Sequence, residues 1–436
     1  MDRRNFIRNS GLLVGASATL ATTGFKSPPT RTSRGIDYGS WQSIREQFPL
    51  TTSRIHMSQM LLASHPTPVR EAIEMHRKKF DENPFEYWEE IFIQADQKVC
   101  DAAARYMDVL PEEVALTDST TMGLGILYNG LILKKGDEIV TTTHDHYSTE
   151  KSLEFAAAKT GAIVKRVSLY DNPSAASTSR IVETLIKAIT PKTKVIAITW
   201  VHSVTGVKLP VRQIADALAP INNQRSKSDK ILLCVDGVHG FGVDNITMKD
   251  MGCDFFVAGT HKWMFGPRGT GILWGRKDVW DRIAPIIPAF REQPYYMWMG
   301  VMPEGPITFT QLCSPGGFFA FEHRWSLNEA FDFHLKIGKD KIHARSRELN
   351  DRLKSGLKQM KHIKLYTPQD PNLSCAINCF DVVGMKPKEV IDKLLSKNIL
   401  ASTTPYKTVY ARLTPSVINT EEEVDLCLKA LEGFAM

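Results

Sequence analysis

The sequence predicts an α/β protein with two domains: a large domain with a mostly parallel sheet flanked by helices, and a smaller C-terminal α+β domain. Three observations predict this fold class. Short apolar runs at residues 231–235, 255–258 and 270–274 end abruptly in turn residues, as strands buried on both faces do. Strand-like and helix-like segments alternate between residues 114 and 221. The chain of 436 residues also exceeds the size of one simple domain.

Composition places the chain among ordinary soluble globular proteins. Apolar residues make up 43% of the chain and charged residues 23%. The net charge of +6 is modest and includes no long Lys/Arg block, so it argues against nucleic acid as a partner. The seven cysteines show neither zinc spacing nor a disulfide framework, and we interpret most of them as core residues. We therefore predict no metal site.

Periodicity and turn residues predict the elements in chain order. Pro68 stands where a helix can start. The expected helices cover residues 41–50, 69–81, about 84–106, about 120–133, 150–160, 179–189, about 210–221 and about 319–356. The expected strands before the three apolar runs cover residues 114–117, 139–143, 163–167 and 195–199. We place the large domain at 34–310, with an N-terminal part that can pack with the small domain, and the linking helix and small domain at 311–436.

An acid and a lysine stand at the ends of two of the buried strands. Asp236 ends the first apolar run, and Lys262, preceded by His261, follows the second. Ligands of open α/β sheets bind outside the strand ends, so the two side chains are well placed to share one ligand. Pyridoxal 5'-phosphate (PLP) needs such a pair, because a lysine forms a Schiff base with its aldehyde and a carboxylate keeps its ring nitrogen protonated. Either residue alone would be interpreted as a turn residue or a solvated side chain.

These residues carry a resemblance to a known family. The segments Asp236-Gly237-Val238-His239 and His261-Lys262-Trp263 resemble motifs of the class V aminotransferases, which are fold type I PLP-dependent enzymes. The nearest match is the isopenicillin N epimerase-like branch, and the resemblance runs from about residue 55 to the C-terminus. It implies a homodimer with PLP as cofactor. It also implies that Lys262 first binds the cofactor and then, freed by the incoming amine, moves the Cα proton.

The resemblance assigns further residues to the cofactor phosphate. Ser119, Thr120 and Thr121 open a helix, where hydroxyl residues are ordinarily caps. A helix N-terminus is also an anion site, because its backbone N–H groups are free and its dipole is positive. The family's equivalent stretch grips the phosphate, so all three residues are candidates and the two threonines are the stronger ones. His261 is expected to help hold the phosphate.

The cofactor ring is assigned in the same way. The resemblance implies that His146 stacks on the pyridine face, and Tyr147 and His144 remain alternatives because a slip of one residue changes the match. Ser203 stands where the family often has an asparagine near the phenolic oxygen. His239 is expected to share that position with Ser203.

Two later segments complete the implied site. Residues 309–316 resemble the family's Gly-Thr-Pro segment, through which a dimer mate reaches the phosphate, and Ser314 replaces the threonine. Residues 409–424 resemble the family's closing motif. Its arginine, Arg412 here, binds the α-carboxylate of the substrate, which a guanidinium can do with two parallel hydrogen bonds.

The N-terminus has the pattern of an export signal. Arg3 and Arg4 precede a short apolar run at residues 11–21, followed by a Thr/Ser/Pro-rich stretch to about residue 33. The pattern resembles a twin-arginine signal, so we predict the twin-arginine export machinery as a partner and a periplasmic enzyme with no stable membrane insertion after processing. A disordered basic tail is the alternative.

The reaction stays open at this point. Transamination, epimerisation and elimination all begin at the same Cα, and the substrate is expected to be an amino acid or a peptidic amine. A cysteine desulfurase, which needs a nucleophilic cysteine near the arginine motif, is an alternative, but residues 411–424 contain none. A non-catalytic binding protein is a second alternative. A Pro-rich loop over residues 285–306, with Arg291, Tyr295, Tyr296 and Trp298, is expected to border the active site and to select a bulky substrate. Packing of these aromatic residues at a dimer interface is the alternative.

Overall fold

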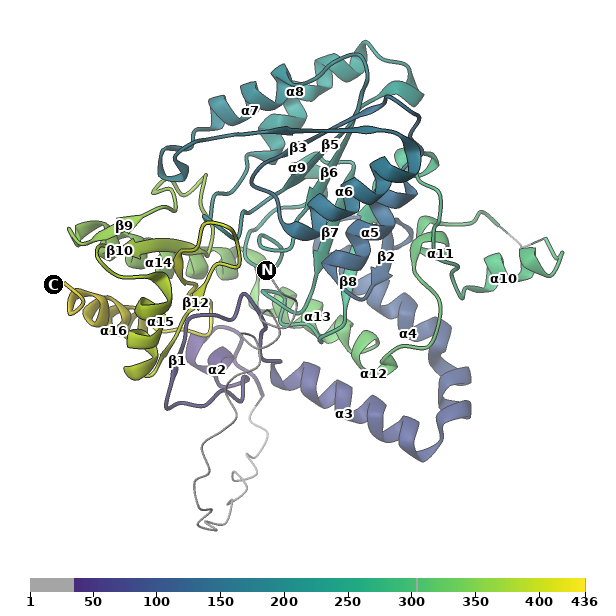
Figure 1. The fold of residues 1–436 in the computed structure, drawn as a ribbon. Helices are drawn as coiled ribbons and strands as arrows, with labels where there is room; N and C mark the ends of the chain where they lie inside the picture. Colours follow the sequence, from purple (N-terminus) through teal and green to yellow (C-terminus); the bar gives the residue numbers. More distant parts are fainter. Residues whose placement is uncertain (1–34, 303–304, 436) are drawn as a thin grey trace, which may run out of the picture. The chain divides into compact units, whose positions relative to one another are not determined.

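The computed structural model describes residues 35–302 and 305–435. Residues 37–436 form one compact unit. The predicted export signal at 1–33 lies outside the described residues. Two sheets organise the compact unit, a seven-stranded one and a four-stranded one (Figure 1).

The large sheet holds the three buried runs that the sequence predicts. Its strands are β2 (Val114–Thr117), β3 (Glu138–Thr142), β4 (Ile163–Val167), β5 (Thr193–Thr199), β6 (Leu232–Asp236), β7 (Phe255–Gly259) and β8 (Gly271–Gly275). They lie in the order β2-β8-β7-β6-β5-β3-β4. Strand β8 is antiparallel to both of its neighbours, and the other pairings are parallel. The predicted mostly parallel sheet is therefore confirmed.

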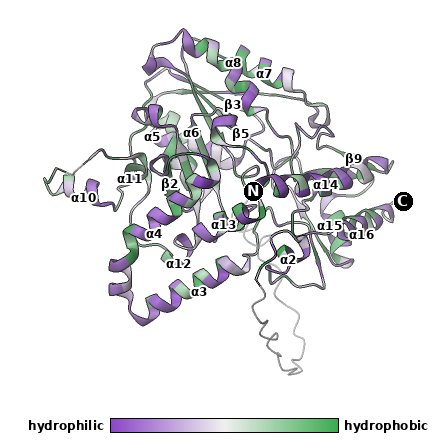
Figure 2. Cartoon of the chain, turned by 180° about the vertical axis from the view of Figure 1, so that it is seen from behind, coloured by the Kyte–Doolittle hydropathy of each residue, from purple (hydrophilic) through white to green (hydrophobic). Residues whose placement is uncertain are grey.

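Helices cover both faces of this sheet, which is why its strands are apolar on both sides. One face packs against α4 (Pro84–Met107), α7 (Thr178–Lys187), α8 (Val211–Asn223) and α13 (Leu327–Ile337). The other packs against α5 (Thr120–Gly130), α6 (Tyr147–Thr160) and α11 (Phe309–Cys313). Successive residues of β7 alternate between the two cores, Phe256 to the first and Phe255 to the second. Figure 2 shows the hydrophobic residues gathered in these strands.

The smaller sheet is antiparallel and carries its own helices. Its strands are β9 (Ile363–Leu365), β10 (Asn378–Val382), β12 (Ser402–Thr403) and β13 (Ala411–Leu413). Its core includes side chains of α14 (Lys339–Gln359), α15 (Pro387–Ser396) and α16 (Glu421–Glu432). Near the N-terminus, β1 (Ile55–His56) pairs in parallel with β11 (Ile399–Leu400). The N-terminal segment is thus built into the C-terminal part of the fold, and the domain boundary at 310/311 stays a prediction.

Two sequence predictions about helices need correction. The long helix expected over 319–356 is three helices: α12 (Phe321–Arg324), α13 and α14. Gly338, between α13 and α14, has φ of 103°, a conformation that side chains disfavour and that ends a helix. The Pro-rich segment is not all loop, because it contains α10 (Glu292–Trp298). The remaining α-helices of the described residues are α2 (Trp41–Arg45), α3 (Thr67–Glu82) and α9 (Met248–Met251).

Candidate active site

A cavity of about 200 Å³ lies where loops leave the carboxyl ends of several parallel strands. The loops after β2, β3, β5, β6 and β7 all contribute to its lining. The strand order reverses between β3 and β5, and such a switch point is where open α/β sheets bind ligands. Every predicted site residue except Ser314 and Arg412 lines this cavity.

Lys262 and Asp236 meet here because β6 and β7 are neighbours in the sheet. The Nζ atom of Lys262 lies 3.3 Å from Nε2 of His239. Burial lowers the pKa of Lys262 to about 8; Asp236 opposes this shift and Arg412 adds to it. Burial likewise raises the pKa of Asp236 to about 6, against the N–H of Val238 and the charge of Lys262. Both groups therefore titrate within about one pH unit of neutral pH, and a ligand that supplies a positive N–H would stabilise the carboxylate of Asp236.

The N-terminus of α5 forms one wall of the cavity. Ser119 is its N-cap, and its Oγ accepts a hydrogen bond from the N–H of Met122 at 3.1 Å. Thr120 Oγ1 accepts from the N–H of Gly259 at 2.8 Å, which ties the helix to the end of β7. A Cβ at Gly259 would lie 2.9 Å from Thr120 Oγ1, so the glycine permits this approach. The first N–H groups of a helix have no partner within it, so the wall can receive an anion.

Several polar side-chain atoms of the cavity residues can still form a hydrogen bond with a ligand. Thr121 Oγ1 and Ser148 Oγ lie 2.9 Å apart. The Nδ1 atoms of His261 and His239 are buried and have no partner among the described residues. Buried nitrogens of this kind are rare and call for a ligand or a water molecule.

His146 lines the cavity and is one of the three candidates for the ring that stacks on the cofactor. It is the N-cap of α6, and its Nδ1 accepts from the N–H of Ser148 at 3.2 Å. Burial and the charge of Lys262 lower its pKa, so the ring stays neutral. Of the two alternatives, Tyr147 is 69% exposed and does not line the cavity. His144 does line it, but its ring stacks on Tyr170 at 3.9 Å. The geometry therefore favours His146.

Arg412 lies behind the cavity wall and is linked to it through Ser203. The Arg412 side chain is 1% exposed, and its Nη1 donates to the carbonyl of Ser203 at 2.9 Å. Its Nε donates to Ser402 Oγ at 3.1 Å and its Nη2 to the carbonyl of Thr403 at 3.2 Å. One N–H of each terminal nitrogen remains for a further acceptor.

The structure adds residues that the sequence interpretation missed. Tyr406 lines the cavity, and its hydroxyl lies 2.7 Å from Ser203 Oγ. His202 and Ser148 also line it. His202 is adjacent to the predicted Ser203, and Ser148 follows His146 by two residues, so both could have been included by proximity. Tyr406 had only one sequence signal, its position six residues before the arginine of the closing motif.

Ser314 does not reach the cavity of this chain. It is 2% exposed, and its Oγ accepts a hydrogen bond from the N–H of Leu116 at 3.0 Å. The hydroxyl is engaged inside its own chain at β2. The predicted contact of Ser314 with a partner's cofactor stays a prediction.

The Pro-rich segment also lies elsewhere than expected. None of residues 285–302 or 305–306 lines the Lys262 cavity, and α10 projects away from the large sheet (Figure 1). Arg291 forms an ion pair with Asp96 at 2.8 Å, and both side chains are largely buried. The guanidinium is already neutralised, so it is not available for a second acidic group of a substrate. The predicted selection of a bulky substrate by this loop is not supported within one chain.

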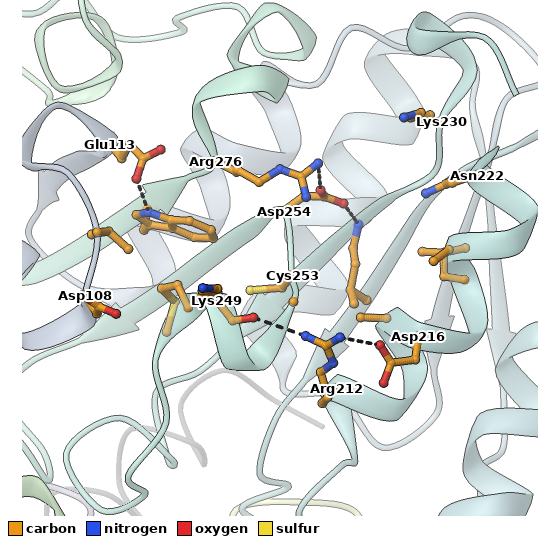
Figure 3. A pocket seen from close by; sticks show the side chains of 18 of the residues that line it. Asp108, Glu113, Arg212, Asp216, Asn222, Lys230, Lys249, Cys253, Asp254 and Arg276 are labelled. Atoms are coloured by element: carbon orange, nitrogen blue, oxygen red, sulfur yellow. Dashed lines mark hydrogen bonds and ion pairs between the residues drawn. The ribbon is translucent and has the colours of Figure 1, made fainter.

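A larger cavity of about 740 Å³ opens at the opposite, amino-terminal ends of β6 and β7 (Figure 3). Two ion pairs lie among the residues that line it. Asp254 binds Arg276 at 2.9 Å, and Arg212 binds Asp216 at 2.7 Å. The smaller cavity is the candidate for catalysis because Lys262, Asp236 and the N-terminus of α5 all face it.

The residues around Lys262 fit PLP. An acid, a lysine and a helix N-terminus face one cavity, as the ring nitrogen, aldehyde and phosphate of that cofactor require. The unpartnered nitrogens of His239 and His261 offer further contacts. Five histidines line the cavity, yet within the described residues no group of three or more His, Cys, Asp or Glu side chains has the arrangement of a metal site. Nor does any described helix have the length and hydropathy needed to span a membrane.

Two curated relatives share sequence over most of their length. A probable cysteine desulfurase from Halalkalibacterium halodurans is 27% identical over 335 residues, which cover 74% of this chain and 77% of the relative. An isopenicillin N epimerase from Streptomyces clavuligerus is 24% identical over 351 residues, which cover 77% of this chain and 83% of the relative.

Two solved structures share the fold. One is the cystine C–S lyase C-DES in complex with its reaction product cysteine persulfide, with a TM-score of 0.80 and 22% identity over 89% of this chain and 100% of that chain. The other is a cysteine desulfurase from Thermococcus onnurineus NA1, with a TM-score of 0.76 and 20% identity over 90% of this chain and 97% of that chain.

The family model described as aminotransferase class-V matches residues 88–405, which is well over half of the chain. This match agrees with the cavity, in which Lys262 and Asp236 meet at neighbouring strand ends. The protein therefore belongs to the class-V aminotransferase family and is a PLP-dependent enzyme.

Proposed function

We propose that this enzyme acts at the α-carbon of an amino acid or peptide-like amine with a free carboxylate, in the manner of isopenicillin N epimerase and related aminotransferases and lyases. The observation that carries the proposal is the shared cavity of Lys262 and Asp236 with Arg412 behind its wall. A base, an acid and a carboxylate-binding group are the parts that Cα chemistry needs.

Each wall of the cavity has one task toward the cofactor. Ser119, Thr120 and Thr121 would hold the phosphate at the N-terminus of α5, with His261 beside them. His146 would cover the ring face, and Ser203 and His239 would contact the phenolic oxygen. Bound PLP supplies an electron-withdrawing ring that accepts the electron pair of a broken Cα bond.

Lys262 is suited to moving the Cα proton. With a pKa of about 8, its amine is partly neutral at physiological pH, unlike an exposed lysine. Asp236 would hold a proton on the ring nitrogen as the anionic partner of an ion pair. Arg412 would fix the substrate carboxylate and so bring its Cα toward the Lys262 amine.

Cleavage of a C–S bond is the second candidate, because probable cysteine desulfurases are among the relatives. A desulfurase that keeps sulfur on its own cysteine needs a thiol in the cavity. The described residues include all seven cysteines: six are buried, Cys375 is half-buried, and none lines the cavity. A lyase that releases the sulfur on its product, as C-DES does with cysteine persulfide, needs no such thiol.

Product analysis separates these reactions. Purified enzyme would be incubated with L-cystine, L-cysteine and a panel of amino acids and peptidyl amines, and the products identified by mass spectrometry and chiral chromatography. Inversion at Cα indicates an epimerase, a keto acid an aminotransferase, and a persulfide or sulfide C–S cleavage. If no compound of the panel changes and none exchanges its Cα hydrogen with D₂O, action at Cα is refuted.

A homodimer remains a prediction of the family resemblance. The feature that supports it is the apolar surface of the Pro-rich segment, where Trp298 is 77% exposed and Tyr295 and Met302 are also exposed. An apolar surface of this kind is typical of an interface between subunits.

Export to the periplasm by the twin-arginine machinery is also part of the proposal, supported by Arg3 and Arg4 before the apolar run at 11–21. We expect the double variant Arg3→Lys, Arg4→Lys to accumulate in the cytoplasm with its signal uncleaved, as measured by fractionation and immunoblotting. Arg8→Lys, outside the pair, is the matched control and should be exported normally. An unchanged periplasmic yield of the double variant contradicts the proposal.

A further inference from the structure

Tyr406 reaches the cavity from the small sheet, whereas Lys262 follows a strand of the large one. It lies in the loop between β12 and β13, residues 404–410. Two hydrogen bonds close the base of this loop: the N–H of Thr404 donates to the carbonyl of Tyr410 at 3.0 Å, and the N–H of Tyr410 donates to Thr404 Oγ1 at 2.9 Å. The loop is thus a fixed support for the Tyr406 phenol.

The hydroxyl groups of Tyr406 and Ser203 form a pair in which one proton has no acceptor. Tyr406 Oη and Ser203 Oγ lie 2.7 Å apart and share one hydrogen bond. Each hydroxyl carries one proton, so whichever group donates, one proton of the pair is left over. No described residue accepts it, and both side chains line the cavity. The pair therefore offers one hydroxyl proton to whatever occupies the cavity.

Ser203 also connects this proton to the predicted carboxylate site. Its carbonyl accepts from Arg412 Nη1 at 2.9 Å, while its hydroxyl binds Tyr406. If Arg412 binds the substrate carboxylate, the Cα lies one bond beyond the carboxylate carbon. The Cα is then close to the Ser203–Tyr406 pair. Lys262 Nζ lies 3.3 Å from His239 Nε2, whereas the Tyr406 ring meets the edge of the His146 ring, with centroids 6.1 Å apart.

We propose that Tyr406 is a second proton-transferring residue of the Cα reaction, opposite Lys262, and that the enzyme inverts the configuration at Cα. This inference rests on the proposed function. Lys262 would take the proton as the Cα–H bond breaks, and PLP, when bound, would accept the electron pair of that bond. Tyr406 gives its hydroxyl proton as the new Cα–H bond forms on the other face. Proton exchange with water then restores both residues, so no oxidant or reductant is consumed.

The protonation states of the two groups suit these opposite roles. Burial raises the pKa of Tyr406 to about 12, against the hydrogen bond of Ser203 and the charge of Arg412, so its phenol is protonated at neutral pH. Lys262, with its pKa near 8, is partly a free amine at the same pH. The cavity therefore holds a base at Lys262 and an acid at Tyr406. In the reverse direction, the product's Cα proton returns through the phenolate.

Glycine in D₂O tests the proposal, because its two Cα hydrogens face opposite sides. The wild-type enzyme should exchange both hydrogens, as followed by ¹H NMR. Tyr406→Phe keeps the ring and removes the proton, so we expect exchange of one hydrogen to continue and that of the other to slow by about 10²-fold or more. Tyr410→Phe is the matched control at the base of the same loop and should exchange both hydrogens.

If Tyr406→Phe exchanges both hydrogens at wild-type rates, the proposal falls while Cα chemistry stands. If the wild type exchanges neither, the proposed function itself falls, and this inference with it.

A second measurement does not depend on turnover. 3-Fluorotyrosine placed at position 406 of the cofactor-free protein reports the state of the phenol by ¹⁹F NMR. Its pKa should lie above that of free fluorotyrosine because of burial, and Ser203→Ala should raise it further by removing the hydrogen bond that favours the phenolate. A pKa equal to that of the free amino acid, unmoved by Ser203→Ala, would show that the phenol is not held in the cavity and would overturn the proposal.

Discussion

Replacing Lys262 by alanine is expected to abolish covalent attachment of PLP and Cα proton transfer while leaving the fold intact. The side chain lies at a strand end rather than in a core cluster, so its loss removes little packing. Loss of the proton-transferring group alone should lower turnover by about 10²–10⁴-fold. Borohydride reduction of wild-type holoenzyme, followed by peptide mass spectrometry, should find the pyridoxyl group on Lys262 and find none in the variant.

Lys339→Ala is the matched control, because Lys339 is another partly buried lysine whose pKa is lowered by burial, and it lies outside the cavity. It should retain the adduct. The pKa of about 8 also fixes the pH dependence of attachment. The rate at which the cofactor-free enzyme binds PLP covalently should rise with pH through about 8 and level off above it, because only the neutral amine reacts. A pyridoxyl group mapped to another lysine refutes the assignment.

We expect Asp236→Asn to lower the activity of the enzyme and to raise the stability of its cofactor-free form. The asparagine cannot hold a proton on the ring nitrogen as an ion pair, so activity should fall by at least about 10²-fold. The cofactor-free variant should nevertheless be more stable than the cofactor-free wild type at pH 7 to 8. The cause is the buried carboxylate, whose pKa is raised from 3.8 to about 6, a difference that corresponds to roughly 3 kcal/mol.

The sign follows from proton linkage. The folded state holds the Asp236 proton more tightly than the unfolded state, so wild-type stability falls as the pH rises from about 4 to 6 and stays reduced above it. Denaturant unfolding of both cofactor-free proteins across this range measures the effect. The advantage of the variant should be present above pH 6 and vanish near pH 4, where the wild-type carboxyl is protonated. An equal difference at every pH would show that burial of the charge is not its cause.

Most of the sheet and of the candidate site could be predicted from local sequence patterns, such as apolar runs and turn residues. The apolar runs that form β6 and β7 could be recognised because a strand covered on both faces has no polar positions. Once the strands were parallel neighbours, Asp236 and Lys262 had to meet at one edge of the sheet. Ser119, Thr120, Thr121 and His146 were assigned through the family resemblance, and they share the cavity because each stands shortly after a strand or at a helix start. The precise partners of these residues still required the three-dimensional fold.

The fold class, together with Asp236 and Lys262 at their strand ends, could be predicted from sequence patterns because strand periodicity and turn residues act over a few neighbouring positions. The hydrogen bonds and ion pairs between residues far apart in the sequence could be seen only in the tertiary structure. Tyr406 reaches Ser203 across 203 positions, Arg291 is neutralised by Asp96, and Ser314 is engaged by β2. Such pairings depend on how the elements pack, and burial then requires each polar group to find a partner that no local pattern specifies.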